Sequence, residues 1–416
     1  MNAADLVAAH GSPLWMADVT GVPRAHAELR ATLAKAWDDV AVAYSYKTNR
    51  LGVFLRALAR DGALAEVVCD AEYLLAREVA GHTGPDIVVN GPAKSDRLLG
   101  WAGRDDALVL LDGPDEVDRA RRAGVRRVGV RVAVPGALGA TSRFGIPPDQ
   151  VVPTAVRARA AGLRVEALSM HVVSTDLDDA VDPSAPLASR VRIRWPRGPD
   201  DHAAGAALLG RLAAEAGRRG VGIGTVDVGG GLPAPPDADE HAHAIGRALA
   251  DAGFRGRLMV EPGRALVSQA VELATTVVAV KRLTDGRRAL IVDAGTNLLP
   301  GALWAWPAIR TAIPPTDGTL LEPALVSGPL CLNTDVLHPA AALPADLRPG
   351  DVLVVSAAGA YQQVQSTQFG DLRPAVVARD DGTWRLARSR ETLDELRAAE
   401  DVGVHTGSGS QRQEDS

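Results

Sequence analysis

Lys47, in the stretch "AYSYKTNR" at residues 43–50, is the first residue of this chain that suggests chemistry. Only four of the 45 basic residues are lysines, so arginine serves wherever charge alone is needed. A guanidinium stays protonated, whereas the amine of a buried lysine can lose its proton and act as a nucleophile. The position indicates either a reactive amine or an ordinary surface lysine, and both interpretations stay open at this point.

Three further groups with chemical potential follow short apolar runs. His171 ends "VEALSMH", the glycines 229–231 follow "TVDV", and Glu261 comes directly after "RLMV". If these runs are parallel strands of one barrel, their carboxyl ends meet at a single face, where barrel enzymes place their active sites. A lysine, a histidine, three glycines and a glutamate would then share one site.

The glycines and the glutamate indicate which kind of cofactor the site could bind. Three consecutive glycines after a strand leave backbone N–H groups free to approach a phosphate, although a tight turn would also explain them. The run "EPGR" at 261–264 adds a carboxylate and a guanidinium three residues apart. A cofactor with a phosphate, an aldehyde for the lysine and a basic ring nitrogen for the glutamate would use every group. Pyridoxal 5′-phosphate (PLP) has all three.

The elements that must position these groups fall into two regions. Between residues 20 and 265, helix-like runs alternate with short apolar runs such as "VAVAYSY", "DIVVN" and "ALVLL". This alternation predicts an α/β fold, a parallel (β/α)8 barrel of the TIM type over 20–265. Residues 266–400 carry β-branched runs split by Gly, Pro and Asp-Gly, which predicts an antiparallel β domain, to which we also assign residues 1–19. The polar end, 401–416, is predicted to be disordered.

The composition argues against several classes of function. A formal net charge of −6 argues against nucleic-acid binding, which uses a basic surface. No run of about 20 apolar residues is present, so we expect no membrane span, and the N-terminus lacks the pattern of a signal peptide. Cys69 and Cys331 offer no disulfide framework, which favours a reduced, cytoplasmic location. His241 and His243 would not share a helix face, so we expect no metal site.

Six motifs also carry a resemblance to a known family. They are, in order, "YSYKTN", "HVVS", "VDVGGGLP", "EPGRALV", "SGPLCLNTDVL" and "GAYQQVQSTQFGDLRP". Together they resemble the fold-type III PLP-dependent decarboxylases, the group of diaminopimelate, ornithine and arginine decarboxylases, over residues 12–378. The resemblance implies an alanine-racemase-like barrel, a C-terminal β domain, PLP as cofactor and loss of the α-carboxylate of an amino acid.

The resemblance implies a role for most of the groups above. Lys47 would hold PLP covalently, a use of lysine that requires a lowered amine pKa. Glu261 would keep the ring nitrogen protonated and so favour decarboxylation, because alanine racemases, generally similar in fold, place an arginine there. The other cofactor contacts that it implies are Glu66 beside the lysine, His171 on the ring, and Ser174, Gly229, Gly230, Gly231, Gly263, Arg264 and Tyr361 around the phosphate. For Glu66, a surface position is the equal alternative.

Cys331 is the second catalytic residue that the resemblance implies. In the family, the cysteine of this motif reaches the partner subunit's active site and protonates Cα after carbon dioxide leaves. Asp335 would contact the substrate or order the interface, and the chain would form a homodimer with two shared sites. Without the resemblance, a lone cysteine is interpreted as a small buried apolar residue.

Departures from the family pattern bear on the substrate. Leu332 and Asn333 follow the cysteine where diaminopimelate decarboxylases usually have Glu-Ser, and "LLPGALWAW" lacks their substrate-binding arginine. Val173 replaces the glycine of the usual "HVGSQ". We therefore expect an amino acid or an amino-acid conjugate, free or bound to a carrier protein, in specialised biosynthesis of the siderophore or antibiotic type.

The segment 181–200, "VDPSAPLASRVRIRWPRGPD", is long for a connection within a barrel, and such loops are often functional. Arg190, Arg192, Arg194 and Arg197 lie in it, and we assign Arg194 to substrate binding, with a solvated loop as the alternative. Two alternatives to a decarboxylase also stay open: a PLP-dependent racemase, and a PLP-carrying homeostasis protein without catalysis.

Overall fold

The computed structural model describes residues 1–134, 143–172, 175–177, 191–193 and 198–400. Eight parallel strands close into a barrel in the order β10-β11-β2-β3-β4-β5-β6-β7. They are β2 (Val40–Ser45), β3 (Leu64–Val67), β4 (Ile87–Val89), β5 (Leu108–Leu111), β6 (Arg127–Arg131), β7 (Arg164–Ser169), β10 (Thr225–Asp227) and β11 (Arg257–Val260). The predicted barrel is therefore confirmed.

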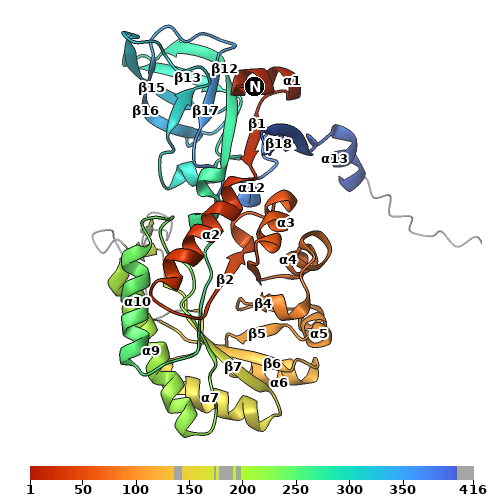
Figure 1. Cartoon of the computed structure of the whole chain (residues 1–416). Helices are drawn as coiled ribbons and strands as arrows, with labels where there is room; N and C mark the ends of the chain where they lie inside the picture. Colours follow the sequence, from red (N-terminus) through yellow and green to blue (C-terminus); the bar gives the residue numbers. More distant parts are fainter. Residues whose placement is uncertain (135–142, 173–174, 178–190, 194–197, 401–416) are drawn as a thin grey trace, which may run out of the picture.

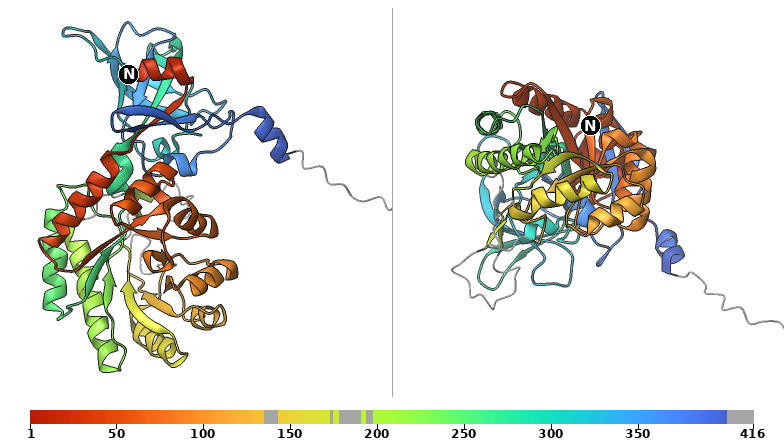
Figure 2. Two further views of the ribbon diagram at one scale, coloured as in Figure 1. Left: turned by 45° about the vertical axis from the view of Figure 1, so that its right-hand side comes forward. Right: turned by 90° about the horizontal axis from the view of Figure 1, so that it is seen from below.

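Helices surround this barrel, as Figure 1 and the view from below in Figure 2 show. They are α2 (Gly21–Ala34), α3 (Gly52–Arg60), α4 (Asp70–Leu74), α5 (Asp96–Asp105), α6 (Glu116–Arg122), α7 (Pro148–Ala160), α9 (Pro199–Arg218), α10 (Asp239–Asp251) and α11 (Arg264–Val267). Strands covered on both faces are apolar throughout, which is why the runs in the sequence are continuous. None of the helices in the described residues is long and apolar enough to cross a membrane.

Small and medium apolar side chains fill the inside of the barrel. Five of its strands contribute to one separate buried cluster, made of Ala43, Val88, Leu108, Leu110, Ala167 and Met259. Because side chains alternate along a strand, the neighbouring positions face the helices and join the main core. The barrel is thus a packed support, and its loops are left to carry the chemistry.

A second domain, built on a nine-stranded sheet, lies at one end of the barrel (Figure 1). Its strands are β1 (Leu14–Asp18), β12 (Val271–Arg282), β13 (Arg288–Val292), β14 (Ile309–Thr311), β15 (Leu321–Ser327), β16 (Val336–Pro344), β17 (Val352–Val355), β18 (Ala375–Asp380) and β19 (Thr383–Arg388). The shorter elements outside the barrel are α1 (Ala3–His10), α12 (Gln362–Gln365), α13 (Leu393–Glu400), and the pair β8 (Thr175–Leu177) and β9 (Val191–Ile193). We expected an antiparallel sheet, and the sheet is mixed.

Two parallel pairs account for this difference. The N-terminal strand β1 lies between β12 and β18, antiparallel to the first and parallel to the second. Strands β13 and β15 are also parallel. Periodicity identifies strands but not their partners, so the direction of a strand that returns from a distant part of the chain could not be predicted from its residues.

Candidate active site

Lys47 lies in a short turn, Tyr46–Thr48, directly after β2, and its Nζ donates a hydrogen bond to Oε2 of Glu66 at 2.6 Å. Glu66 comes from the neighbouring strand β3 and is fully buried. The hydroxyl of Ser45 donates to the same carboxylate oxygen at 2.5 Å. The structure therefore places Glu66 beside the lysine and not on the surface.

The electrostatics around Lys47 differ from our expectation of a lowered pKa. Burial disfavours its ammonium form, but the carboxylate of Glu66 outweighs that effect and raises the pKa of Lys47. Burial likewise acts to raise the pKa of Glu66, yet the nearby ammonium lowers it. Lys47 is thus held as an ammonium in an ion pair with Glu66.

His171 and the three glycines form one wall of the same pocket. His171 follows β7, and its Nδ1 accepts a hydrogen bond from the backbone N–H of Gly230 at 3.1 Å. Burial and the positive charges of Lys47 and Arg131 lower the pKa of His171 to about 3. Its imidazole is therefore neutral, with the proton on Nε2.

The glycine run leaves no room for side chains. A Cβ on Gly229 would lie 2.5 Å from the carbonyl oxygen of Met170, and one on Gly230 would lie 2.7 Å from that of Glu261. Gly229 and Gly231 also have φ values of +71° and +87°, which L side chains rarely adopt. Only glycine fits at these positions, because the backbone approaches its neighbours closely or adopts a left-handed conformation. The backbone of Gly230 and Gly231 therefore lines the pocket directly.

Glu261 follows β11 at the bottom of the pocket and belongs to a buried polar cluster. Nδ2 of Asn90 donates to Oε1 of Glu261 at 3.1 Å. Burial, together with the adjacent carboxyl of Asp227, raises the pKa of Glu261 well above its ordinary value. Burial also raises the pKa of Asp227 to about 6, although a hydrogen bond from Glu261 opposes that shift. Glu261 is therefore a neutral acid that shares its proton with Asp227.

The β domain contributes Tyr361 to this pocket. Its backbone N–H donates to the carbonyl of Thr48 at 2.9 Å, and the guanidinium of Arg264 lies 4.6 Å from the centre of its ring. Arg264 opens α11, just after Gly263, where a Cβ would lie 2.0 Å from Oγ1 of Thr48. The predicted residues that line this one pocket are Lys47, His171, Gly230, Gly231, Glu261, Gly263, Arg264 and Tyr361.

Cys331 and Asp335 do not line the pocket within one chain. Cys331 is exposed on the loop between β15 and β16. Asp335 is only 1% exposed, and its carboxylate accepts hydrogen bonds from the backbone N–H groups of Thr296 and Leu330 at 2.7 and 2.8 Å. Its side chain therefore fixes the loop that presents Cys331.

Two of the predicted residues, Ser174 and Arg194, lie outside the described residues, as do Arg190 and Arg197. Three polar residues of the site were not predicted: Ser45 lines the pocket, and Asn90 and Asp227 form hydrogen bonds with Glu261. Each lies at the carboxyl end of a barrel strand. That position could have identified them, because the ends of all eight strands face the site.

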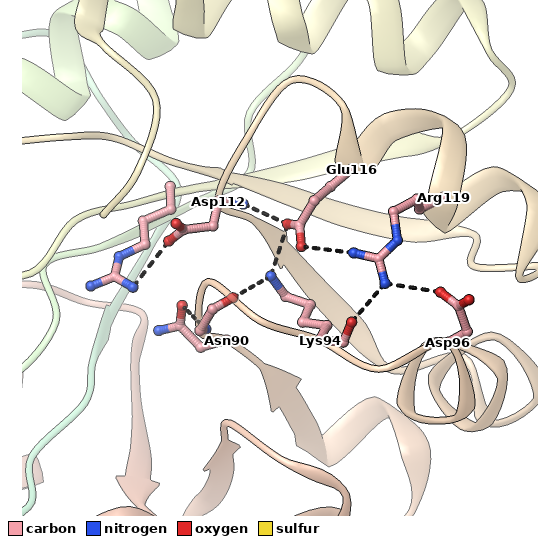
Figure 3. A network of polar contacts seen from close by, with 8 residues as sticks. Asn90, Lys94, Asp96, Asp112, Glu116 and Arg119 are labelled. Carbon is pink, nitrogen blue, oxygen red and sulfur yellow. Dashed lines mark hydrogen bonds and ion pairs between the residues drawn. The ribbon is translucent and has the colours of Figure 1, made fainter. Parts of the chain in front are cut away.

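Lys94, which is buried whereas the Lys47 side chain is 39% exposed, shows the structural use of the same residue type (Figure 3). Its Nζ donates to the carbonyl of Gly91 at 2.6 Å and to Oε2 of Glu116 at 2.9 Å. Arg119 extends the network to Asp96 and to the Lys94 carbonyl. Burial lowers the pKa of Lys94 despite the Glu116 carboxylate. This network joins the loop after β4 to α5 and α6.

Comparisons with known proteins identify the family. Residues 43–359 match the model of the pyridoxal-dependent decarboxylases, C-terminal sheet domain. The diaminopimelate decarboxylase of Deinococcus radiodurans is 33% identical over 404 residues, which is 94% of this chain and 96% of the relative. The lysine/ornithine decarboxylase of Selenomonas ruminantium is 26% identical over 92% of this chain and 93% of the relative.

Solved structures of diaminopimelate decarboxylases have the same fold as this chain. The diaminopimelate decarboxylase of Helicobacter pylori complexed with L-lysine superposes with a TM-score of 0.83 at 23% identity, over 97% of this chain and all of that one. This chain thus belongs to the fold-type III PLP-dependent decarboxylases. It is a PLP-dependent amino-acid decarboxylase of the diaminopimelate decarboxylase-like group. This membership argues against the two alternatives, a PLP-dependent racemase and a PLP-carrying homeostasis protein without catalysis.

Proposed function

We propose that the protein decarboxylates an amino acid whose distal end is masked or conjugated, in specialised biosynthesis, as a cytoplasmic homodimer with shared active sites. The observation that carries the substrate proposal is Leu332. This apolar residue is 47% exposed and follows Cys331 where diaminopimelate decarboxylases usually have a glutamate. The two cysteines are free thiols, which supports the cytoplasmic location.

The residues of the pocket fit PLP. The N–H groups of Gly229 and Gly230 already donate to Asp227 and His171. The phosphate would therefore be held by Arg264 and Tyr361 beside the Gly231 backbone, all of which line the pocket. Lys47 supplies the amine that holds the aldehyde carbon, and neutral His171 offers a flat face for the ring. PLP, when bound, takes up the electron pair released as a bond to Cα breaks.

Two proton positions follow from the electrostatics. Glu66, at 2.6 Å from Nζ of Lys47, holds and orients the ammonium, which must lose a proton before it becomes a nucleophile. Glu261 keeps a proton to donate to a basic ring nitrogen, since Asp227 and burial both favour its neutral form. Asn90 holds the Glu261 carboxyl in place.

An apolar surface around Cys331 supports the dimer. The chain segments 297–306, 328–335 and 361–370 lie together, joined by bonds such as that from the Thr367 N–H to the Asn297 carbonyl. Their exposed large apolar residues are Leu303, Trp304, Trp306, Leu332 and Phe369. Contiguous exposed apolar side chains of this kind mark protein interfaces. A second copy seated there would receive Cys331 in its own Lys47 pocket.

The same surface argues for a masked substrate. Free diaminopimelate carries a charged amine and a charged carboxylate at its distal end, and each would need a polar partner on binding. Leu332 offers none, and a polar group buried without a partner costs about 1–3 kcal/mol. A distal end that is acylated, esterified or attached to a carrier protein removes that penalty.

The test is a panel of amino acids given to the purified enzyme with PLP, with carbon dioxide release and chiral analysis as readouts. We expect release from substrates with a masked distal end, and a kcat/KM for meso-diaminopimelate lower by roughly 10²-fold or more, since unpaired polar groups discriminate strongly. The variant Leu332→Glu should gain activity toward meso-diaminopimelate. If the wild type prefers meso-diaminopimelate, the specialised substrate is refuted.

A further inference from the structure

A pocket of about 370 Å³ lies beside the Lys47 turn, where the barrel meets the β domain. It is formed by the start of α3, by α12 with the residues that follow it, and by the end of β19. None of its lining residues lines the Lys47 pocket described above. It is therefore a separate cavity, and nothing in the decarboxylase mechanism uses it.

The lining is strongly basic. Arg50, Arg373 and Arg388 all contribute to it, and none of the described residues that line it is acidic. Glu391 lies 3.7 Å from one end of the Arg373 guanidinium, but its carboxylate also accepts hydrogen bonds from Gln368 and from the Arg373 N–H. The same carboxylate also interacts electrostatically with Arg388. Within the described part of the chain Arg50 makes no ion pair, so three arginines share one nearby carboxylate and the pocket keeps excess positive charge.

Two donors in this lining have no acceptor. Nε of Arg388 and Nε2 of Gln363 are shielded from solvent, and neither forms a hydrogen bond within the described residues. Burial and the adjacent Arg373 lower the pKa of Arg388, which shows that its charge is poorly accommodated. Buried donors without partners are rare in proteins and call for an acceptor that the chain itself does not supply.

We propose that this pocket binds a phosphate group, either free phosphate or the phosphate of a small ester. The planar guanidinium pairs with phosphate oxygens through two parallel hydrogen bonds, which a cluster of three arginines can repeat from several sides. A doubly charged anion also balances the excess positive charge. The half-buried guanidinium of Arg388 then gains a counter-ion.

The pocket is connected to the Lys47 turn through Gln363. The Oε1 of this side chain accepts a hydrogen bond at 3.2 Å from Nδ2 of Asn49, which also donates to the Gly359 carbonyl at 2.9 Å. Asn49 is buried and lies two residues after Lys47. Gln363 thereby joins the pocket to the turn that carries the lysine.

The experiment uses the enzyme saturated with PLP, so that the cofactor's own phosphate site is filled. Inorganic phosphate and glycerol 3-phosphate are titrated at constant ionic strength, maintained with sodium chloride, and followed by calorimetry and by the thermal unfolding midpoint. We expect saturable binding and a rise in the midpoint. Tighter binding of one probe assigns the source as free phosphate or as an ester.

Variants of the pocket arginines test whether the phosphate binds in this pocket. Arg388→Gln should weaken binding at least tenfold, and in chloride alone it should match or raise the unfolding midpoint, because it removes an uncompensated charge. Arg385→Gln removes an exposed arginine from the same strand and should bind like the wild type. If Arg388→Gln fails to fold, Arg50→Gln tests the rim of the pocket with the same expectation. No saturable binding, or equal binding by the pocket variant and the control, would overturn the proposal.

Discussion

Asp227 offers the sharpest test of the electrostatics under the cofactor site. It is fully buried at the end of β10, where its Oδ1 accepts a hydrogen bond from the Gly229 N–H at 2.8 Å. Because Glu261 donates the proton that the two carboxyls share, Asp227 is the group that ionises first. Its pKa is raised from 3.8 to about 6 by burial, so the folded protein binds this proton more tightly than the unfolded chain.

The size of the effect follows from linkage. A group whose folded pKa is raised stabilises the protein fully below its unfolded pKa, and that contribution is lost as pH rises through the folded value. Between pH 3.8 and about 6 the loss for Asp227 corresponds to about 3 kcal/mol, at roughly 1.4 kcal/mol per pH unit. Asp227→Asn stays neutral, so it should gain about 3 kcal/mol over the wild type between pH 4 and pH 7.

The assay is urea unfolding of the cofactor-free protein at pH 4 and pH 7, for the wild type and the variant. Cofactor-free protein is used because a bound ring nitrogen would change the charge beside Glu261. Asp251→Asn, an exposed position at the end of α10, controls for the loss of one carboxylate and should show little pH-dependent gain. A difference between Asp227→Asn and the wild type that is the same at both pH values would refute the shared-proton interpretation.

Four further variants test individual residues of the site. Lys47→Ala should lose the covalent, borohydride-reducible cofactor linkage, as mass spectrometry of the reduced protein will show. Cys331→Ala should keep PLP absorbance while decarboxylation falls by roughly 10²–10⁴-fold, the contribution typical of a general acid; an unchanged rate would remove it from the mechanism. Glu66→Gln should lower the pKa of Lys47, because the carboxylate that stabilises its ammonium is removed, and stopped-flow absorbance should show cofactor loading at lower pH than in the wild type. Gly230→Ala should weaken PLP binding, because the added Cβ would lie 2.7 Å from the Glu261 carbonyl oxygen; an unaltered spectral titration would contradict the close approach.

The barrel could be predicted because its strands are short apolar runs at regular intervals. The same runs located Lys47, His171 and Glu261, since each follows a strand and all strand ends meet at one face. The glycine run was equally visible, because three consecutive glycines after a strand have few other uses. These features depend on local sequence, and local sequence was enough.

Features that depend on tertiary contacts could not be predicted from local sequence. The raised pKa of Lys47 depends on Glu66, which comes from another strand. The proton shared by Glu261 and Asp227 depends on how two strand ends approach each other. The parallel pairing of β1 with β18 joins segments from opposite ends of the chain, and no pattern in either strand indicates it.

Subunit complementation tests the central claim, that one active site combines Lys47 of one chain with Cys331 of the other. Lys47→Ala and Cys331→Ala are each nearly inactive in this account, and the two are mixed in equal amounts under conditions that exchange subunits. Half of the dimers then carry both variants, and in each of these one of the two sites has both residues intact. Carbon dioxide release should therefore recover to about a quarter of the wild-type rate, because half of the dimers each have one intact site out of two. No recovery, while mixed dimers are shown to form, would contradict it.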